Sequence, residues 1–405
     1  MRNATSRWTW GATGWALLWA ATAAVAAPDG PVKIGVLGDF TGAYADLSGK
    51  GSVEAARMAV EDFGGKVLGK PVEIVFADHQ SKTDVGATVA KRWYDAEGVD
   101  MITDLTHTAV AIAVQGISKD RKKINIVTST ASTALTNENC SPWSAHWTFD
   151  AYALSNGTAR AMIEGGAKKW FFITADYGFG HNLEAQATSV VKAMGGTVVG
   201  RALHPLNTSD FSSQLVQARA SGADVIALAN AGTDTSNVVK QANEFGLTKK
   251  QKIAALLVFL TDVHAMGLKN AQGLVFTEAF YWDMNDETRA WSERFYKRHK
   301  AMPTMVHAGT YSAVMHYLKA IQAVGSKDSD KVMARMRETP VNDFAWKGGQ
   351  VRIDGRHDHD MYLFEVKAPG ESKRDWDYYK TVRKIPQGKA FMPLEESKCA
   401  HVKKG

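Results

Sequence analysis

Apolar residues follow two alternating patterns along this chain. Short runs such as VKIGVLGDF (32–40) have the valine, isoleucine and leucine density of a strand that is buried on both faces. Between such runs, apolar residues recur every three or four positions, as they do on one face of a helix. The first series predicts strands at 32–40, 71–78, 99–105 and 124–129, with helices over 53–63, 87–93 and 108–121. Strands separated by amphipathic helices are typical of βαβ units and a parallel sheet.

The pattern begins again near residues 146–152, which predicts a second unit of the same kind. This series predicts strands at 170–176, 197–203, 224–232, 253–260 and 273–282, with helices between them. The sequence then becomes helix-rich, and 350–366 is predicted to form a hairpin with Asp354 and Gly355 at its turn. Two successive α/β units, in a chain too long for one ordinary core, predict two lobes with a sheet in each.

The first residues predict export. Two arginines precede an apolar, alanine-rich stretch, residues 15–27, that ends in small residues, as secretory signals do. The stretch is shorter than the roughly 20 apolar residues of a membrane span. We expect residues 1–27 to be a signal peptide that is cleaved after Ala26 or Ala27, with a retained membrane anchor as the alternative. No other segment is apolar enough to cross a bilayer, so we expect a soluble, exported mature protein.

Charge and cysteine content narrow the class further. The formal net charge is +6, and the basic residues are spread along the chain instead of forming basic runs with interleaved aromatics. That distribution argues against a nucleic-acid partner. The two cysteines, Cys140 and Cys399, suggest one disulfide in an exported protein, which would tie the C-terminal tail to the middle of the chain. Two free thiols are the alternative.

Candidate binding residues follow the strands, where open α/β sheets bind their ligands. In the first unit, Tyr44 and Ser48 follow the first strand, Thr106 and Thr108 stand at a helix start, and the segment 127–136 is rich in hydroxyls. A helix N-terminus with hydroxyls is a ready site for an anion. The alternative is that these serines and threonines only cap helices.

The second unit offers the segment TADYGFG (174–180) after one strand, and Phe259 after another. The two glycines could cradle a phosphate, present Tyr177 to a ligand, or form only a tight turn. No lysine or ribose-binding acid supports a phosphate, so we expect Tyr177 and Phe259 to face a cleft.

Motifs of enzymes are absent from the sequence. There is no Gly-x-Ser-x-Gly, no Gly-Lys-Ser/Thr loop, and no Gly-x-Gly-x-x-Gly after the first strand. RHDHD (356–360) resembles a metal cluster in composition, but strand alternation would separate its histidines from Asp358, and a metal needs three or four converging ligands. We expect a solvated hairpin there. The sequence therefore predicts a protein that is not an enzyme and has no cofactor and no metal.

Four segments, in order and with suitable spacing, resemble the leucine/isoleucine/valine-binding type of periplasmic binding protein. They are IGVLGDFTGAYADLSGKGSVEAARMAVEDFGG, LTHTAVAIAV, STASTALT and ITADYGFGHN, and the resemblance runs from about residue 31 to 365. It implies two Rossmann-like lobes with parallel sheets, joined by a hinge of three crossovers near 146–152, 278–282 and 360. The implied lobes are 31–148 plus 282–360, and 149–280 plus 361–405 with the tail, which the disulfide would fasten near the hinge.

The resemblance also implies a ligand site. In the family, hydroxyls and backbone N–H groups hold the ligand carboxylate, and the matching positions here are Thr106, His107, Thr108, Ser129, Thr130 and Ala131. The family's stacking tyrosine matches Tyr177. Amino-acid binders place an acid after the strand at 253–260, but the nearest acid here is Asp262, several residues on. Ala231 also stands in a loop of small residues where such binders have a tyrosine.

We therefore predict a ligand that has a carboxylate but lacks an ammonium group, because burying an unpaired ammonium costs several kcal/mol. Its apolar or aromatic body would contact the side chains of Tyr44, Tyr152, Tyr177, Phe259 and Trp282. Asp176 could instead pair with an ammonium, which keeps branched-chain amino acids or amides as the alternative. A protonated His107 would strengthen carboxylate binding.

The implied function is that of a monomeric solute-binding protein of an ABC importer. It would capture the ligand by hinge closure and deliver it to the membrane permease. A sensor ectodomain and an exported amide hydrolase are the other classes considered. The predicted ligand-binding residues are Tyr44, Ser48, Thr106, His107, Thr108, Ser129, Thr130, Ala131, Tyr152, Asp176, Tyr177, Ala231, Phe259 and Trp282.

Overall fold

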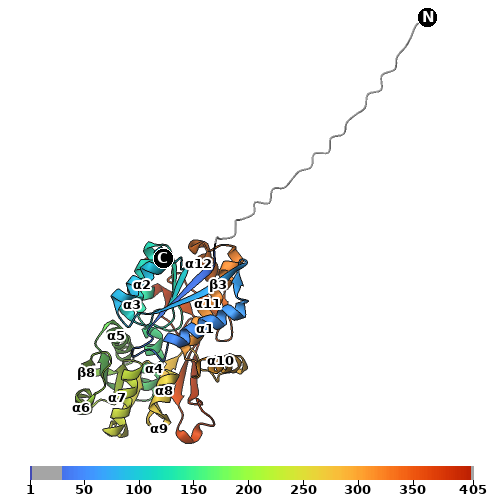
Figure 1. Ribbon diagram of the computed structural model, residues 1–405. Coiled ribbons are helices and arrows are strands. Elements are labelled where there is room, and N and C mark those ends of the chain that lie inside the picture. The colour runs from blue at the N-terminus through green and yellow to red at the C-terminus, as the bar shows by residue number, and fades with distance from the viewer. Residues whose placement is uncertain (2–29, 403–405) are drawn as a thin grey trace.

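Two α/β lobes lie one against the other, each built on its own sheet (Figure 1). The computed structural model describes Met1 and residues 30–402 of the 405-residue chain. The predicted signal peptide, apart from Met1, lies outside the described residues. No helix among the described residues has both the length and the apolar character that crossing a membrane requires.

The first lobe contains a six-stranded sheet in the order β2-β3-β1-β4-β5-β6. Its strands are parallel except for the short β2–β3 hairpin. The strands are β1 (Val32–Gly38), β2 (Lys66–Val67), β3 (Lys70–Asp78), β4 (Met101–Asp104), β5 (Ile124–Val127) and β6 (Ser144–His146). The helices interleaved with them are α1 (Gly49–Phe63), α2 (Thr83–Asp95) and α3 (Thr108–Asp120), with the 3-10 turn η1 (Thr133–Thr136). The predicted βαβ pattern is confirmed here.

The second lobe contains a seven-stranded sheet in the order β16-β15-β11-β10-β9-β7-β8. Five strands are parallel: β7 (Lys169–Ala175), β8 (Thr197–His204), β9 (Val225–Ala229), β10 (Lys252–Ala255) and β11 (Val275–Glu278). Two antiparallel strands complete it: β15 (Met361–Val366) and β16 (Tyr379–Ile385). Its helices are α4 (Ala151–Glu164), α5 (Gly178–Ala193), α6 (Ser212–Ala220), α7 (Thr233–Glu244), α8 (Leu260–Met266) and α9 (Leu268–Ala271), with the 3-10 turn η2 (Leu247–Lys249).

The helix-rich segment returns to the first lobe, where α10 and α11 pack against α1. This segment comprises α10 (Asp286–His299), α11 (Met305–Val324) and α12 (Ser329–Glu338), followed by β12 (Val341–Asn342), β13 (Lys347–Val351) and β14 (His357–Asp358). The chain therefore passes between the lobes three times, at 147–150, 279–285 and 359–360. These passages agree with a three-crossover hinge, and the exact lobe borders stay a prediction.

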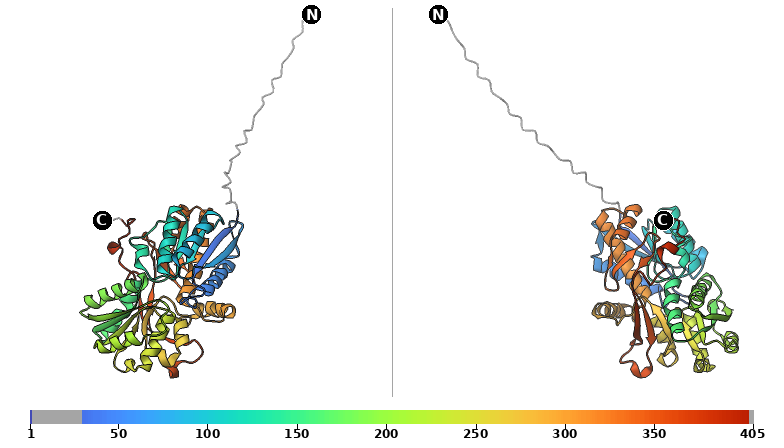
Figure 2. Two further views of the ribbon diagram at one scale, coloured as in Figure 1. Left: turned by 60° about the vertical axis from the view of Figure 1, so that its left-hand side comes forward. Right: turned by 180° about the vertical axis from the view of Figure 1, so that it is seen from behind.

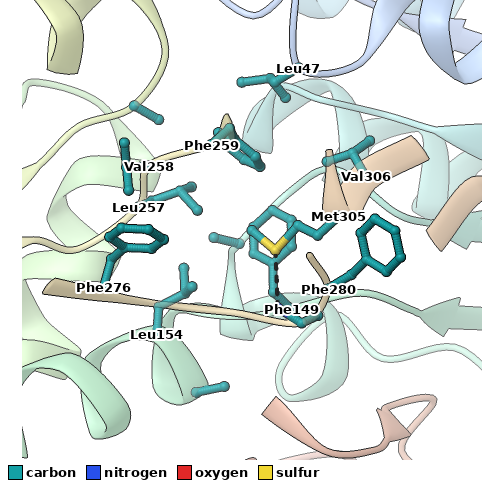
Figure 3. Packing of buried hydrophobic residues seen from close by; sticks show 14 of the residues in the cluster. Leu47, Phe149, Leu154, Leu257, Val258, Phe259, Phe276, Phe280, Met305 and Val306 are labelled. Atoms are coloured by element: carbon teal, nitrogen blue, oxygen red, sulfur yellow. Dashed lines mark hydrogen bonds between the residues drawn. The ribbon is translucent and has the colours of Figure 1, made fainter. Parts of the chain in front are cut away.

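A continuous aromatic and aliphatic cluster fills the junction between the lobes. Figure 3 shows side chains of Leu47 and Met305 from the first lobe packed with Leu154 and Phe259 from the second. Phe149, on the first crossover, meets Phe259 edge to face with the ring centroids 6.1 Å apart. The crossovers are thus part of the core and not loose linkers.

The prediction of a solvated hairpin at 356–360 is wrong. The Asp354–Gly355 turn does join two antiparallel strands, β13 and β14. However, Arg356, His357 and His359 are all buried. This segment is the third crossover, and it packs against the first, where both histidine rings lie 3.2 Å from the carbonyl oxygen of Trp147. Among the described residues no group of three or more His, Cys, Asp or Glu is arranged to hold a metal.

Two other segments differ from the predicted elements. The apolar run 253–260 is a strand only to Ala255, because the next four residues leave the sheet and lie buried at the lobe junction. The predicted hairpin over 350–366 is divided, since β15 leaves the first lobe and pairs with β11 of the second sheet. The hydrophobic pattern could not show where the strand at 253–260 ends, because buried strands and buried connections are equally apolar. Nor could it show that the two arms of the predicted hairpin belong to different sheets.

The C-terminal tail crosses back from the second lobe to the first, as Figure 2 shows. After β16 it contains the short 3-10 turn η4 (Leu394–Glu396), and its backbone at Lys398 donates to Asn137. The predicted disulfide is confirmed: Cys399 is bonded to Cys140, with the Cα atoms 5.6 Å apart. The bridge covalently fixes the tail of the second lobe to the first.

Candidate functional site

The carboxyl ends of both sheets face one another across a small, partly open cavity. Loops after β1, β4 and β5 supply the wall from the first lobe, and segments after β7, β9 and β10 supply the wall from the second. The lining residues are Tyr44, Leu47, Thr106, Thr108, Ser129, Ala131, Tyr177, Phe179, Ala231, Leu257 and Phe259.

The first-lobe wall presents hydroxyls. Thr106 follows β4, and its Oγ1 lies 2.8 Å from Ser48 Oγ and accepts from Ser129 Oγ at 3.3 Å. Thr108 begins α3, which has no side-chain cap from any described residue. The N–H groups of its first turn are therefore available to an anion, and the positive end of the helix dipole favours one.

The second-lobe wall is aromatic and aliphatic. Tyr177 stands at the N-cap of α5, and the chain turns tightly after it because Gly180 packs on β7, where a Cβ would lie 2.1 Å from the oxygen of Ala175. Phe259 stands at the N-cap of α8, where its N–H donates to Asp262 Oδ2 at 2.9 Å. These backbone constraints direct both rings to the cleft.

Direct contacts join the lobes across the cavity. The hydroxyls of Tyr44 and Tyr177 are hydrogen-bonded to each other, and both phenols are largely buried. The ring of His107 stacks on Tyr177 with the centroids 4.9 Å apart. At the edge of the cleft the N–H of Thr133 donates to Asn182 Oδ1 at 3.2 Å. The structure is therefore the closed form of a two-lobed molecule.

None of the side chains that line the cavity is charged among the residues that the structure describes. Acidic groups lie behind the walls instead. Burial raises the pKa of Asp104 and that of Asp262 to about 7 each, and that of Asp234 to about 6. Burial lowers the pKa of His107, so its ring is neutral at pH 7 and does not supply the positive charge considered from the sequence.

Eight of the residues predicted to bind the ligand line this one cavity: Tyr44, Thr106, Thr108, Ser129, Ala131, Tyr177, Ala231 and Phe259. Ser48 lies behind Thr106, to which it is hydrogen-bonded, and His107 lies behind Tyr177. Thr130 turns its hydroxyl to the carbonyl oxygen of Leu105. These three support the wall and do not form its surface.

Three other predicted residues lie away from the cavity. Tyr152 is half-buried on α4 on the side of the tail residue Glu396. Asp176 is largely exposed and pairs with His181 at 2.9 Å. Trp282 is buried on the second crossover, where its indole N–H donates to the oxygen of Trp376 at 2.8 Å.

Leu47, Phe179 and Leu257 line the cavity without having been predicted. Phe179 was detectable, because it lies two residues after Tyr177 in the same turn. Leu257 was placed inside a predicted strand, so it was not considered for the cavity. Leu47 is apolar like many core residues, and no motif marks it as a binding residue.

Two lobes on a three-crossover hinge, closed over a small uncharged cavity at the strand ends, define a solute-binding protein. A family model described as periplasmic binding protein matches residues 31–373, and the chain belongs to this family. Leu/Ile/Val-binding protein homolog 6 of Brucella abortus (strain 2308) is 30% identical over 362 residues, which cover 85% of this chain and 90% of that protein.

Similar solved structures belong to the same class of protein. A periplasmic binding protein from Burkholderia mallei is 49% identical with a TM-score of 0.90, covering 92% of this chain and 99% of that chain. A branched-chain amino acid ABC transporter periplasmic ligand-binding protein from Burkholderia xenovorans LB400 is 42% identical with a TM-score of 0.84, covering 92% and 100%. A solute-binding protein from R. palustris, solved with 4-hydroxybenzoate, is 25% identical with a TM-score of 0.80, covering 88% and 97%. This chain is a periplasmic substrate-binding protein of an ABC transporter, a class of transport proteins and not of enzymes.

Proposed function

We propose that this protein captures a small carboxylate with an apolar, preferably aromatic, body and delivers it to the permease of an ABC importer. The observation that carries the proposal is the division of the cavity into two kinds of wall. Hydroxyls and the start of α3 form one side of the cavity. The other side is apolar, because the side chains of Leu47, Phe179, Leu257 and Phe259 offer it only carbon atoms. A carboxylate fits the first side, and an apolar ring or branched chain fits the second.

The electrostatics of the cavity support a ligand without an ammonium group. An α-amino acid would bring a positive charge into a cavity where, of the described residues, none that lines it is acidic. Asp176, the acid considered from the sequence, pairs with His181 on the surface. Asp262, the other candidate, already accepts from the backbone of Phe259.

The size of the cavity supports a small ligand. Side chains of the two lobes meet across it, since the hydroxyls of Tyr44 and Tyr177 are hydrogen-bonded to each other. A dipeptide or a nucleotide would therefore hold the lobes apart, whereas a compact ligand with a single ring and a carboxylate requires less displacement of these walls. The R. palustris protein with 4-hydroxybenzoate shows that the same fold encloses an aromatic acid elsewhere.

Thermal unfolding with a panel of ligands tests this proposal. Benzoate, 4-hydroxybenzoate, cinnamate and isobutyrate are compared with leucine, valine and leucinamide at equal concentration. A true ligand at 100 times its Kd stabilises the folded state by about 2.7 kcal/mol, so it raises Tm. We expect a rise with at least one of the acids and none with the amino acids.

The opposite result, stabilisation by leucine or valine alone, would establish the amino-acid alternative and overturn the proposal. Mass spectrometry of the stabilising compound after incubation adds a second control. Recovery of the unchanged compound agrees with a carrier, whereas a hydrolysed product would show an enzyme.

A further inference from the structure

Asp104 is a buried acid without a partner, directly behind the hydroxyl wall of the cavity. It ends β4 in the middle of the first sheet, with Leu37 and Val127 as neighbours on the adjacent strands. Its side chain is completely buried, and neither carboxyl oxygen has a hydrogen-bond partner among the described residues. Such a group is costly to bury in its charged form.

The backbone at this point is strained as well. Asp104 has φ of +81° and Leu105 has φ of +65°, and both lie in the region that L-residues seldom adopt. Two consecutive residues of this kind persist only where the surrounding structure fixes them, and they cluster at functional sites. The strain turns the chain so that Thr106 reaches the cavity.

Hydroxyl groups connect Asp104 to the cavity. The hydroxyls of Ser48, Ser52 and Ser129 lie near enough to its carboxyl group to lower its pKa, although none of them is hydrogen-bonded to it in this structure. Two of these serines are the groups that contact Thr106, at 2.8 and 3.3 Å, and Thr106 lines the cavity. One hydroxyl therefore separates the buried acid from the hydroxyl that faces the ligand.

The charged groups around Asp104 do not neutralise it. Asp39, from the loop after β1, faces it and raises its pKa in addition to burial, whereas the three serines lower it. His79 and His107, from the segments after β3 and β4, lie near Asp39, and burial lowers the pKa of both. His307 of α11 contacts the Ser48 carbonyl, and its pKa is lowered to about 3. These three histidines are neutral near pH 7 and supply no counter-charge.

We propose that Asp104 is a positioning residue that must hold a proton for the anionic ligand to bind, and that its protonation sets the direction in which the hydroxyls donate. When Asp104 is neutral, Ser129 donates to Thr106, and the proton of Thr106 is free to point to the ligand carboxylate. When Asp104 is ionised, the serine protons turn to it, and Thr106 donates back to a serine. The ligand then loses a donor and faces a second negative charge.

This inference rests on the proposed function, and a pH series with benzoate as the probe tests it. Benzoate is ionised throughout pH 6–9, because simple carboxyl groups titrate near pH 4. The matched variants are Asp104→Asn, which keeps the shape and tolerates positive φ, and Asp100→Asn. Asp100 is a buried acid at the opposite end of β4, paired with Lys327 at 3.1 Å.

We expect the affinity of the wild type for benzoate to fall as pH rises from 6 to 9, by up to tenfold per pH unit above pH 7. Calorimetry in two buffers of different ionisation enthalpy should show proton uptake on binding. Burial also raises the pKa of Asp262 to about 7 and that of Asp234 to about 6, so the decisive comparison is between the wild type and the two variants. The number of protons taken up on binding, given by the slope of log Kd against pH, should be one lower in Asp104→Asn than in the wild type. In Asp100→Asn this slope should equal that of the wild type.

The same slope in the wild type and in Asp104→Asn would overturn the proposal and leave the proposed function intact. A failure of the wild type to bind benzoate or any other acid of the panel at any pH would instead overturn the function first. A measurement without ligand tests the proposal about Asp104 independently of the proposed function. Because the pKa of Asp104 is raised in the folded state, its ionisation destabilises the wild type as pH rises from about 4 to 7, and the Tm advantage of Asp104→Asn should grow over that range. A constant Tm difference would show that Asp104 holds no proton and would overturn the proposal.

Discussion

At Gly232 the backbones of the two lobes approach each other closely. The φ of this glycine is +64°, and a Cβ built on it would lie 2.4 Å from the carbonyl oxygen of Ala43 in the other lobe. A real Cβ atom does not tolerate this distance from a backbone atom. Closure of the cleft therefore depends on the absence of a side chain at this position.

We predict that Gly232→Ala weakens ligand binding at least tenfold, because the closed form can no longer be reached. The control is Gly222→Ala, at φ of +67°, where no described atom lies within 4 Å of the added Cβ. Both changes should cost about 1 kcal/mol or more of folding stability through backbone strain. Only Gly232→Ala should weaken binding in calorimetry, and equal affinities in the two variants would contradict the prediction.

The pair of phenols between the lobes allows a double-mutant test. Tyr177→Phe leaves the buried hydroxyl of Tyr44 without a partner, which costs about 1–3 kcal/mol in the closed form. We expect ligand affinity to fall by a corresponding factor of roughly 5 to 150. Removing both hydroxyls, in Tyr44→Phe/Tyr177→Phe, should restore part of the loss. A double variant as weak as the sum of both single variants would show that the hydroxyls act independently.

The sequence located the cavity but not every surface of it. Thr106, Thr108 and Ser129 could be predicted because hydroxyls after parallel strands meet at one edge of a sheet. Trp282 could not be placed, since a tryptophan next to a crossover can turn either to the cleft or, as here, to Trp376. Its direction depends on the connection between β15 and β16, which carries Trp376 and which no local pattern places beside the second crossover.

At the level of elements, the parallel strands could be predicted from their apolar runs and the places of the crossovers only from the family resemblance, whereas the burial of the third crossover could not be predicted. Strands such as β7 and β9 are buried on both faces, so their apolar runs stand out. The segment 356–360 is polar in sequence, yet Arg356, His357 and His359 are buried inside the hinge. Arg356 lies 3.6 Å from Asp150, donates to the carbonyl of Phe149 at 3.1 Å, and covers the ring of Phe391 at 4.4 Å.

We predict that Arg356→Met destabilises the protein by about 3–5 kcal/mol, because it leaves Asp150 buried without its counter-charge. Asp150 also caps α4, so the loss affects both a crossover and the helix that follows it. The control is Arg374→Gln, whose half-exposed guanidinium pairs with Asp283 at 3.0 Å. An exposed pair contributes only about 0–1 kcal/mol. Urea unfolding measures both, and similar losses in the two variants would contradict a structural role for the hinge arginine.

For the whole molecule, the disulfide is a fourth connection between the lobes. The sheet that contains β16 belongs to the second lobe, whereas Cys140 lies between β5 and β6 of the first. The bridge therefore limits how far the lobes can separate on the side of the tail.

We predict that Cys140→Ser/Cys399→Ser lowers the stability by up to about 5 kcal/mol, as the loop-entropy model gives for a long loop. Without the bridge the lobes of the ligand-free protein should also open wider. Calorimetry measures the first effect, and the radius of gyration from X-ray scattering, compared with the oxidised wild type, measures the second. An unchanged Tm and radius would show that the hydrogen bonds of the tail suffice.

The position of the bridge also orders the assembly of the protein in time. Cys399 is synthesised 259 residues after Cys140, so the first thiol waits, reduced, while nearly the whole fold is made. With only two cysteines in the chain, no wrong intramolecular pairing competes. Pairing can therefore begin only after Cys399 has been made, and it requires an oxidant but no reshuffling.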